Sequence, residues 1–408
     1  MKAGGLRRSV LAAAALVAVV AGLDRLLPPP LARLADLSVT VTDRSGAPLR
    51  VFASGAGTWR LPVAGEAAPL YLRMLTAYED RRFFDHAGVD PLAVVRAAAQ
   101  NLGAGRVVSG ASTLTMQVAR LLEPHRRSWS AKLLEMVRAL QLEERADKRT
   151  LLGYYLTLAP FGGALEGIEA GSRAWFGKSP RYLSPAEAAL LVALPQAPGR
   201  LRPDRFPAAA RAARDKVLAR AVASGVLSEQ VAAEARAEPV PTRQHSFPDA
   251  APHLAEHLRL RHPGAVRVVS TLDGALQRQV EDLARREIPG LVEHGGLAIL
   301  IADNASRAVL ASVGAPDPHD DGRDGWIDMV RAVRSPGSAL KPFIYGLGFE
   351  DRVVHPETLI SDVSTRFGDY APANFDRGFH GELTVREALQ RSLNVPAVLI
   401  LDRVGPAR

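Results

Sequence analysis

The 408-residue sequence predicts a multidomain protein with a mainly α domain, a second α+β domain and an N-terminal transmembrane helix. Three observations support this prediction. An uninterrupted apolar run covers residues 10–23, and a helical pattern punctuated by prolines extends from Pro69 to about Pro203. Two further apolar runs, at 297–302 and 308–313, flank a short polar turn and predict a strand–turn–strand unit. A chain of this length is expected to hold roughly two to three domains.

The N-terminus has the pattern of an export signal. Lys2, Arg7 and Arg8 precede the apolar run, and Asp24 and Arg25 close it. A positive flank followed by a short apolar core is typical of a secretory signal or a signal-anchor. The run is shorter than the ~20 residues that cross a bilayer comfortably, yet we expect an uncleaved single-pass anchor within residues 1–35. The positive-inside rule then leaves the first residues in the cytoplasm and places the rest of the chain across the membrane.

Residues 36–204 form the predicted first domain. Alternating apolar and polar residues from Leu37 to Phe52 predict a hairpin of short strands. A linker is expected over residues 205–265, with one helix followed by a looser polar segment, and residues 266–408 form the predicted second domain. The expected helices are Leu70–Tyr78, Pro91–Asn101, Thr113–Leu122, Ser130–Arg145, Lys148–Leu158, Leu165–Trp175, Pro185–Leu194 and, in the linker, Ala208–Ser224.

Composition limits the chemistry. The absence of cysteine excludes disulfides and thiolate metal sites. The net charge of +8 comes almost entirely from arginine, since the chain has six lysines among 51 basic residues. This charge fits an anionic partner such as nucleic acid, phospholipid or a pyrophosphate substrate, and it equally fits a compositional habit of an alanine- and arginine-rich chain.

The first candidate site is the segment Glu79–Asp90, which holds four carboxylates, two arginines, a histidine and two adjacent phenylalanines. It begins where an amphipathic helix ends, so Phe83 and Phe84 are expected to anchor the turn in the core. Glu79 and Asp80 would then be held toward a cleft, and a carboxylate fixed in this way between two helices is a candidate general base. The alternative is an ordinary charged helix end with surface ion pairs, which contribute little.

Three more clusters follow in the helical region. Ser112 and Thr113 precede a helix that carries Gln117 and Arg120, an arrangement that suits anion binding or a simple helix cap. Lys132 and Glu135 share a face of the next helix, as they would in a catalytic cluster or in a surface helix with ion pairs. A fourth cluster, over residues 155–163 and 175–178, could also be a Pro/Gly turn between packed helices.

The second domain carries a possible nucleophile. Ser338 follows Pro-Gly, where a helix can begin, and Lys341 lies one turn later on the same face. A lysine within hydrogen-bond range can act as the base of such a serine, and S-x-x-K is a signature of penicillin-binding enzymes. Ser392 and Asn394 follow in an S-x-N pattern.

In order and spacing, these motifs resemble the class A penicillin-binding proteins, which polymerise peptidoglycan from lipid II. The resemblance rests on E-D-x-x-F-x-x-H-x-G from Glu79, G-x-S-T-L-T-x-Q from Gly110, K-x-x-E from Lys132, and the flanks R-S-P-G and K-P-F of S-x-x-K. The segment 159–163 is similar to the penicillin-binding protein 1C branch. The chain departs from most of the family at Gly153 and Thr157, where glutamates are usual.

The resemblance implies a lysozyme-like glycosyltransferase domain and a β-lactamase-like serine transpeptidase domain. It implies that Glu79 is the general base of an inverting glycosyl transfer and that Glu135 is a second carboxylate. A divalent metal such as Mg²⁺ at Glu135 is one option, and no organic cofactor is expected. In the second domain Ser338 would form the acyl-enzyme with Lys341 as its base. The residues implied to bind or shape the substrate sites are Asp80, Phe83, His86, Ser112, Thr113, Gln117, Arg120, Lys132, Ser392 and Asn394.

The resemblance also implies partners and location. These are lipid II, the growing glycan strand, the lipid bilayer, β-lactams at Ser338 and other cell-wall synthesis proteins, with no nucleic acid. The expected place is the bacterial cytoplasmic membrane, with the catalytic domains on its outer side. The third transpeptidase motif, Lys-Thr/Ser-Gly, does not occur in the chain. We therefore expect the transpeptidase domain to be truncated and its activity in this fragment to be in doubt.

Two other functions fit the same residues. A helical domain with a carboxylate in a cleft also suits a lysozyme-like hydrolase, which would shorten preformed glycan and make no polymer from lipid II. A non-catalytic penicillin-binding scaffold would bind labelled penicillin at Ser338 and make no glycan.

Overall fold

The computed structural model describes residues 26–63, 67–104, 112–126, 128–291 and 294–407. The chain divides into two compact units, Met1–Val330 and Arg331–Arg408. The expected transmembrane helix lies outside the described residues. Within the described ranges, no helix is both long enough and apolar enough to cross a membrane.

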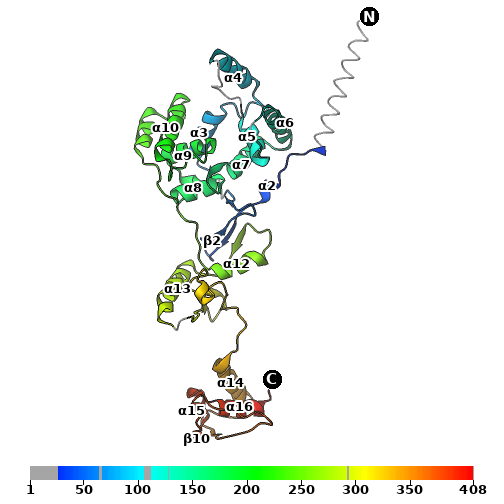
Figure 1. Ribbon diagram of the computed structural model, residues 1–408, viewed down its shortest axis with the longest axis vertical. Coiled ribbons are helices and arrows are strands. Elements are labelled where there is room, and N and C mark those ends of the chain that lie inside the picture. Colours follow the sequence, from blue (N-terminus) through cyan, green and yellow to red (C-terminus); the bar gives the residue numbers. More distant parts are fainter. Residues whose placement is uncertain (1–25, 64–66, 105–111, 127, 292–293, 408) are drawn as a thin grey trace. The chain divides into compact units, whose positions relative to one another are not determined.

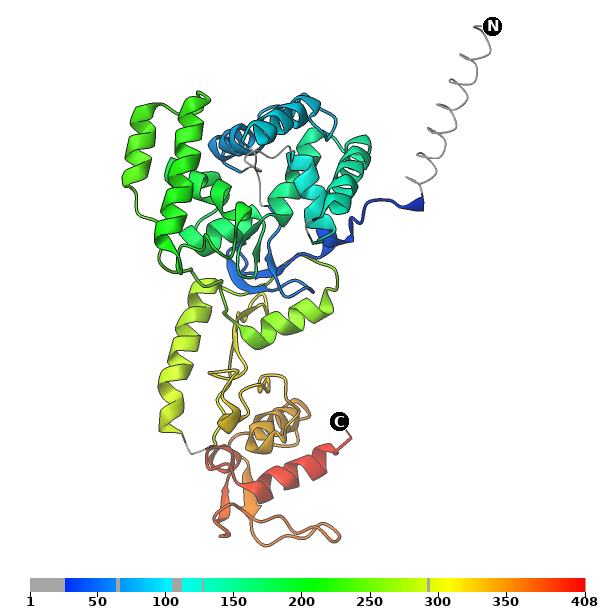
Figure 2. The same cartoon turned by 45° about the horizontal axis from the view of Figure 1, so that its top comes forward.

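The first unit is built mainly from helices (Figure 1). Helices α3, α9, α10 and α11 pack together, and α5, α6 and α7 form a second group beside them (Figures 1 and 2). The helices are α2 (Ala32–Ala35), α3 (Pro69–Glu79), α4 (Pro91–Ala104), α5 (Leu114–Leu122), α6 (Trp129–Arg145), α7 (Lys148–Leu158), α8 (Ile168–Phe176), α9 (Pro185–Ala193), α10 (Pro207–Ala223), α11 (Glu229–Ala237), α12 (Pro252–Arg261) and α13 (Gly274–Glu287), with short 3-10 turns η1 (Pro180–Tyr182), η2 (Leu194–Gln196), η3 (Ile288–Gly290) and η4 (Asp321–Arg323).

The predicted helices are confirmed to within a few residues. Their ends are set by capping side chains that lie close in sequence to the backbone groups they bind. Ser184 and Glu187 form the capping box at the start of α9, and the Asp90 carboxylate accepts a hydrogen bond from the Ala93 amide at the start of α4. The one larger shift is at α8, which begins at Ile168 because Leu165–Glu166 is a strand.

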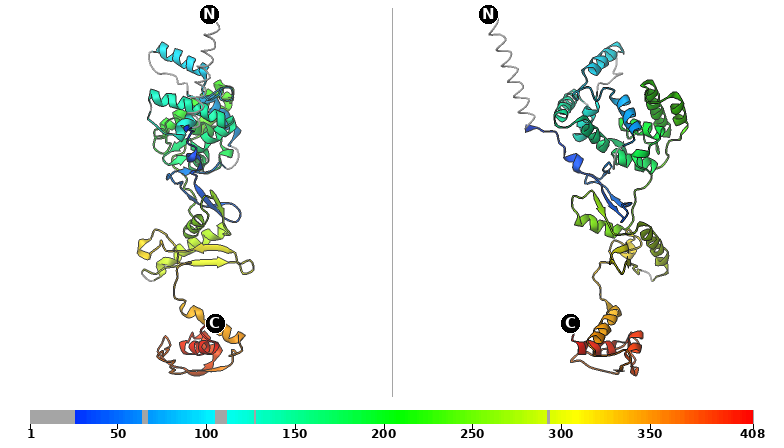
Figure 3. Two further views of the ribbon diagram at one scale, coloured as in Figure 1. Left: turned by 90° about the vertical axis from the view of Figure 1, so that its right-hand side faces the viewer. Right: turned by 180° about the vertical axis from the view of Figure 1, so that it is seen from behind.

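Small sheets lie at the edge of the helical core. Strands β1 (Val39–Thr42) and β2 (Pro48–Phe52) form the predicted hairpin, and β6 (Arg267–Val269) adds to β1 in parallel. Helix α12 lies beside this hairpin (Figure 3). Strand β5 (Leu165–Glu166) pairs with β3 (Trp59–Arg60) and with β4 (Pro160–Gly162), while β7 (Ile299–Ala302) and β8 (Val309–Val313) form the predicted strand–turn–strand unit.

Residues 205–265 contain three helices where the sequence pattern predicted one. Helix α10 contributes Ala210, Val217 and Leu218 to the same core as α9. Helices α11 and α12 were missed because each is short and buries only one or two alanines, so its apolar periodicity is weak.

The turn after α3 is anchored by one phenylalanine instead of two. Phe83 is 1% exposed in the core, whereas Phe84 is 61% exposed, so the expectation that both are buried is wrong. Consecutive residues in a turn point in different directions, and only one of the two rings can face the core. Lys148 lies 4.6 Å above the buried ring, a cation–π contact.

The second unit has a small core of its own, centred on Tyr345, Val385 and Ile400. Its elements are η5 (Gly337–Leu340), α14 (Lys341–Glu350), β9 (Leu359–Asp362), β10 (Gly381–Thr384), α15 (Val385–Gln390) and α16 (Asn394–Val404). Strands β9 and β10 pair antiparallel, and α14 packs on α16.

The two adjacent phenylalanines give a matched stability test. Replacing Phe83 with alanine removes a fully buried ring and is expected to destabilise the helical unit by about 3–5 kcal/mol. Phe84→Ala is expected to change stability by less than about 0.5 kcal/mol, because its ring is exposed. Thermal or urea unfolding, followed by circular dichroism, measures both. Equal losses for the two variants would contradict this assignment of the core.

Candidate active site

Glu79 is the last residue of α3, and two amide side chains hold its carboxylate. Gln117 of α5 donates to Oε2 at 2.9 Å, and Gln196 of η2 donates to Oε1 at 2.8 Å. Gln117 was expected in the site, whereas Gln196 belongs to none of the motifs. Both oxygens therefore have a fixed direction, which a general base needs for proton transfer.

Two buried tyrosines lie near this carboxylate. The hydroxyls of Tyr71 and Tyr155 have no hydrogen-bond partner among the described residues. Burial, with a further contribution from the Glu79 charge, raises the pKa of both phenols above the ordinary value. Tyr71 and Tyr155 therefore stay neutral within the core next to α3.

Asp80 joins the first motif to α5. Its buried carboxylate accepts hydrogen bonds at 3.0 Å from the His86 ring and from the Leu114 amide, one of the unpaired N–H groups at the start of α5. Asp80 and His86 thus connect the turn after α3 to the start of α5, and their part in shaping a substrate site stays a prediction. Gly88 approaches the Ala139 carbonyl so closely, at φ +87°, that a Cβ there would clash.

Ser112 and Thr113 have different roles at the start of α5. The Thr113 hydroxyl is buried, caps the helix by accepting from the Met116 amide, and donates to the Gly88 carbonyl. Both hydrogen bonds of that hydroxyl are to the backbone, so they stabilise the fold. Ser112 instead accepts a hydrogen bond from the Lys132 ammonium, so it remains at the site.

Basic side chains surround the Glu135 carboxylate on α6. Lys132 lies 2.8 Å from Oε2, while His125 and Arg120 lie 3.3 and 4.0 Å from Oε1. Glu135 is buried, and its charge holds Lys132 and Arg120 together against their mutual repulsion. His125 lies outside the motifs singled out in the sequence.

Glu79 and Ser112 line one cleft. It has a volume of about 260 Å³ and is lined by Glu79, Asp80, Ser112 and Thr113, with Arg81, Arg82, Arg96 and Arg220 among its walls. The base and the hydroxyl bound to Lys132 therefore face the same space. Gln117 and Arg120 lie one turn apart on α5 and contact Glu79 and Glu135, respectively.

The surroundings of Glu135 do not fit a magnesium site. Its neighbours include the positively charged Lys132 and Arg120, which repel a cation, and Mg²⁺ prefers oxygen ligands. In the described ranges, no group of three or more His, Asp or Glu side chains could hold a metal ion. The metal therefore stays an untested prediction that these neighbours do not favour, and no step below uses it.

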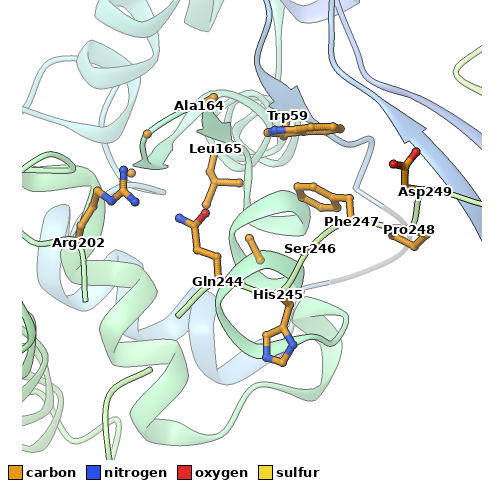
Figure 4. Close-up of a pocket in the computed structure, with 13 residues that line it drawn as sticks. Trp59, Ala164, Leu165, Arg202, Gln244, His245, Ser246, Phe247, Pro248 and Asp249 are labelled. Carbon is orange, nitrogen blue, oxygen red and sulfur yellow. The ribbon is translucent and has the colours of Figure 1, made fainter. Parts of the chain in front are cut away.

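The fourth motif cluster is a packing element. Tyr155, Phe161 and Trp175 are buried in the helical core, and the Trp175 indole donates to the Phe161 carbonyl at 2.9 Å. A separate cavity of about 420 Å³ opens nearby, where Trp59 and Phe247 face Arg202 (Figure 4). The predicted catalytic residues do not line this cavity.

In the second unit, the structure brings three of the four predicted residues together. The Lys341 ammonium donates to the Asn394 side-chain oxygen at 2.7 Å, to the Ser392 hydroxyl at 3.1 Å and to the Ser392 carbonyl. Ser338 lies exposed in η5, and it is not among the hydrogen-bond partners of Lys341. Burial lowers the pKa of the Lys341 ammonium below its ordinary value.

Asn374 positions Asn394, a role that no motif indicated. The Asn374 side chain accepts a hydrogen bond from the Asn394 amide at 2.8 Å and donates to both oxygens of the fully buried Asp362 at 2.9 Å. Ser392 has φ +55°, which is uncommon for a non-glycine residue and turns its hydroxyl and carbonyl toward Lys341.

Comparison with known proteins agrees with the motifs. Residues 48–222 match the family described as Transglycosylase, and residues 297–408 match the Penicillin binding protein transpeptidase domain. The two matches occur in the predicted order, with Glu79, the predicted base, in the first and Ser338 in the second.

Several relatives match along most of the chain. Penicillin-binding protein 1C of Escherichia coli (strain K12) is 48% identical over 388 residues, which cover 95% of this chain and 50% of the relative. Penicillin-binding protein 1F of Bacillus subtilis (strain 168) is 30% identical and covers 85% of this chain and 51% of the relative. The chain spans about half the length of the curated relatives it matches.

A crystal structure of penicillin-binding protein 1A from Haemophilus influenzae aligns with 91% of this chain and 62% of its own, at 15% identity and a TM-score of 0.45. That score is too low to add to the assignment, which rests on the two domain matches and the sequence relatives. The chain belongs to the class A penicillin-binding proteins, with a transglycosylase domain ahead of a penicillin-binding transpeptidase domain.

Proposed function

We propose that the first unit polymerises peptidoglycan by transferring the growing glycan strand onto lipid II, with undecaprenyl pyrophosphate as the leaving group. The observation that supports this best is the single cleft onto which Glu79 and the Lys132-bound Ser112 both face. This reaction needs a base and a nearby cation, and Ser112 links the cleft at Glu79 to the Lys132 ammonium.

In the proposed step, Glu79 removes the proton from a sugar hydroxyl of lipid II. That oxygen forms a bond to the anomeric carbon of the growing strand as the bond from this carbon to the pyrophosphate oxygen breaks, with inversion. The hydrogen bonds from Gln117 and Gln196 keep the Glu79 carboxylate aimed at the acceptor.

The leaving pyrophosphate gains negative charge as its bond to the sugar breaks. Lys132 and Arg120 supply positive charge for it, and Glu135 keeps these two cations in place before the substrate arrives. This feature favours glycosyl transfer over the lysozyme-like alternative, because a hydrolase must protonate a sugar leaving group instead.

The proposed location is the outer face of the cytoplasmic membrane, where the polyprenyl tail of lipid II is anchored. Helix α6 supports it: Lys132 and Glu135 contact the site, while Leu133, Val137 and Leu140 are exposed. With Trp129, these apolar side chains follow a helical spacing, and such an exposed stripe is typical of a surface that meets lipid or another protein.

We further propose that Ser338 forms an acyl-enzyme with penicillins and that Lys341 serves as its base. The support is the contact of the buried Lys341 with Ser392 and Asn394, two residues that the resemblance implies for the same site. Ser338 must approach Lys341 for this step. Labelling by penicillin without any glycan synthesis would favour the scaffold alternative for the chain as it stands.

Replacing the base gives the most direct test. Glu79→Gln keeps the size of the side chain but cannot accept the proton, and its amide nitrogen cannot accept one of the two hydrogen bonds that the carboxylate receives. Lipid II polymerisation is therefore expected to fall about 10²–10⁴-fold. Asp85→Asn is the matched control, since this exposed carboxylate belongs to the same motif and lines no part of the cleft. Polymer formation is measured by gel electrophoresis of labelled glycan. An unchanged rate for Glu79→Gln would remove Glu79 as the base.

The cation cluster gives a second test. Lys132→Ala is expected to lower the turnover number about 10²–10³-fold, because one stabilising charge at the leaving pyrophosphate is lost. Lys216→Ala, an exposed lysine on α10, serves as the control. If both variants turn over at the rate of the unsubstituted chain, the leaving group is not bound at Lys132.

The second unit can be tested with labelled penicillin. Because burial lowers the pKa of Lys341, its neutral amine forms at a lower pH than that of a free lysine, whose ordinary pKa is 10.5. The acylation rate is therefore expected to rise with pH through a midpoint below 10.5. Ser338→Ala should abolish the label, which mass spectrometry locates. Equal labelling of Ser338→Ala would show that the nucleophile is elsewhere.

A further inference from the structure

The segment Leu26–Asp36, called the strap below, connects the apolar N-terminal run to the helical unit. Pro28, Pro29 and Pro30 make its first part stiff, because proline fixes φ and cannot donate a backbone hydrogen bond. The fully buried Arg60 holds its far end by donating to the Arg33 and Asp36 carbonyls at 2.7 and 2.6 Å. The strap is therefore fixed to the domain along its length.

One strap residue holds the C-terminal end of α5. The Arg33 guanidinium donates to the Leu121 carbonyl, one of the last carbonyls of α5 that lack a partner within the helix. The same guanidinium pairs with Glu166 at 2.6 Å, and Glu166 also pairs with Arg60. Leu121 follows directly after Arg120, so this bond lies one residue from a cation of the proposed site.

The strap also contacts α6, one turn beyond Glu135. The Leu27 carbonyl accepts hydrogen bonds from Arg138 at 2.6 Å and from Gln141 at 3.2 Å. Arg138 further pairs with Glu123, the C-cap of α5, at 3.2 Å. Arg138 belongs to α6, and its side chain is 14% exposed. Its guanidinium therefore connects α6 both to the strap and to the end of α5.

We propose that the strap is a structural part of the glycosyl-transfer site, in which Arg33 and Arg138 are positioning residues that fix α5 against α6. This inference rests on the proposed function. Arg120 lies on α5 and Lys132 on α6, so the spacing of these helices sets the spacing of the two cations that receive the pyrophosphate. The position of the chain at the membrane is thereby coupled to the geometry of the catalytic cations.

The predicted effect is on turnover more than on substrate binding. A misplacement of about 1 Å in a catalytic group can reduce the rate about 10²-fold. Arg33→Ala and Arg138→Ala are therefore expected to lower kcat for lipid II polymerisation about 10- to 100-fold with little change in KM. The kcat of Arg138→Lys should lie between those of the unsubstituted chain and Arg138→Ala. An ammonium keeps the charge but cannot bridge Leu27 and Glu123 as a guanidinium does. Arg211→Ala, an exposed arginine on α10, is the control.

A double-mutant cycle separates positioning from general stability. If Arg138 acts through the cation cluster, Arg138→Ala should lower kcat by a smaller factor in an Arg120→Lys background than in the unsubstituted chain. The inference would be overturned if the fall in kcat of the double variant equalled the product of the two single falls. It would also be overturned if Arg33→Ala and Arg138→Ala had the same kcat as the control Arg211→Ala. The unfolding temperature is measured for every variant, so that each assay is run well below that temperature.

Hydrogen exchange provides a readout that does not depend on activity. Arg33→Ala should speed amide exchange in the last turn of α5, and Arg138→Ala in the second half of α6, while Arg211→Ala should change neither. If the unsubstituted chain made no polymer, the proposed function would fail and the exchange measurement alone would decide the inference. Unchanged exchange in both helices would overturn it.

Discussion

Helix α5 is the element on which the arrangement of the site depends. One of its side chains, Gln117, holds the Glu79 carboxylate, and another, Arg120, faces Glu135. The helix has only nine residues, which is too short to be stable alone, so its position must come from its surroundings. Asp80 accepts from its first amide and Arg33 donates to a carbonyl in its last turn. Charged groups from two other segments therefore fix both ends of the helix that connects base and cations.

The cations impose a second constraint. Lys132 and Arg120 would repel each other in the same small space without a counter-charge, and the buried Glu135 supplies it. This explains the division between Glu79, which is held by neutral amides and faces the cleft, and Glu135, which is surrounded by positive charge. The second unit uses a different solution, in which the buried Lys341 is placed by Asn394, and Asn394 by Asn374.

Local patterns predicted the parts of this structure that local interactions determine. The helix caps at Thr113, Ser184 and Asp90 are such parts, as are the facing positions of Lys132 and Glu135 on one helix. The contacts that sequence reasoning missed join residues far apart in the chain. Gln196 reaches Glu79 across 117 positions, Arg33 reaches Leu121 across 88, and Asn374 reaches Asn394 across 20. Glutamine, arginine and asparagine are common surface residues, so nothing in their local sequence marks these three. The choice between Phe83 and Phe84 as the core residue likewise depends on the direction of the turn, which the pattern does not contain.

The central claim is that Glu79 and the Lys132–Arg120 pair act on one substrate assembly within one cleft. A crystal structure of the chain with a non-reactive lipid II analogue tests it most directly. The account predicts the acceptor hydroxyl at about 2.6–3.2 Å from the Glu79 carboxylate and pyrophosphate oxygens in contact with Lys132 and Arg120. An analogue seated instead in the cavity between Trp59 and Arg202, or bound with its pyrophosphate remote from Lys132, would contradict it.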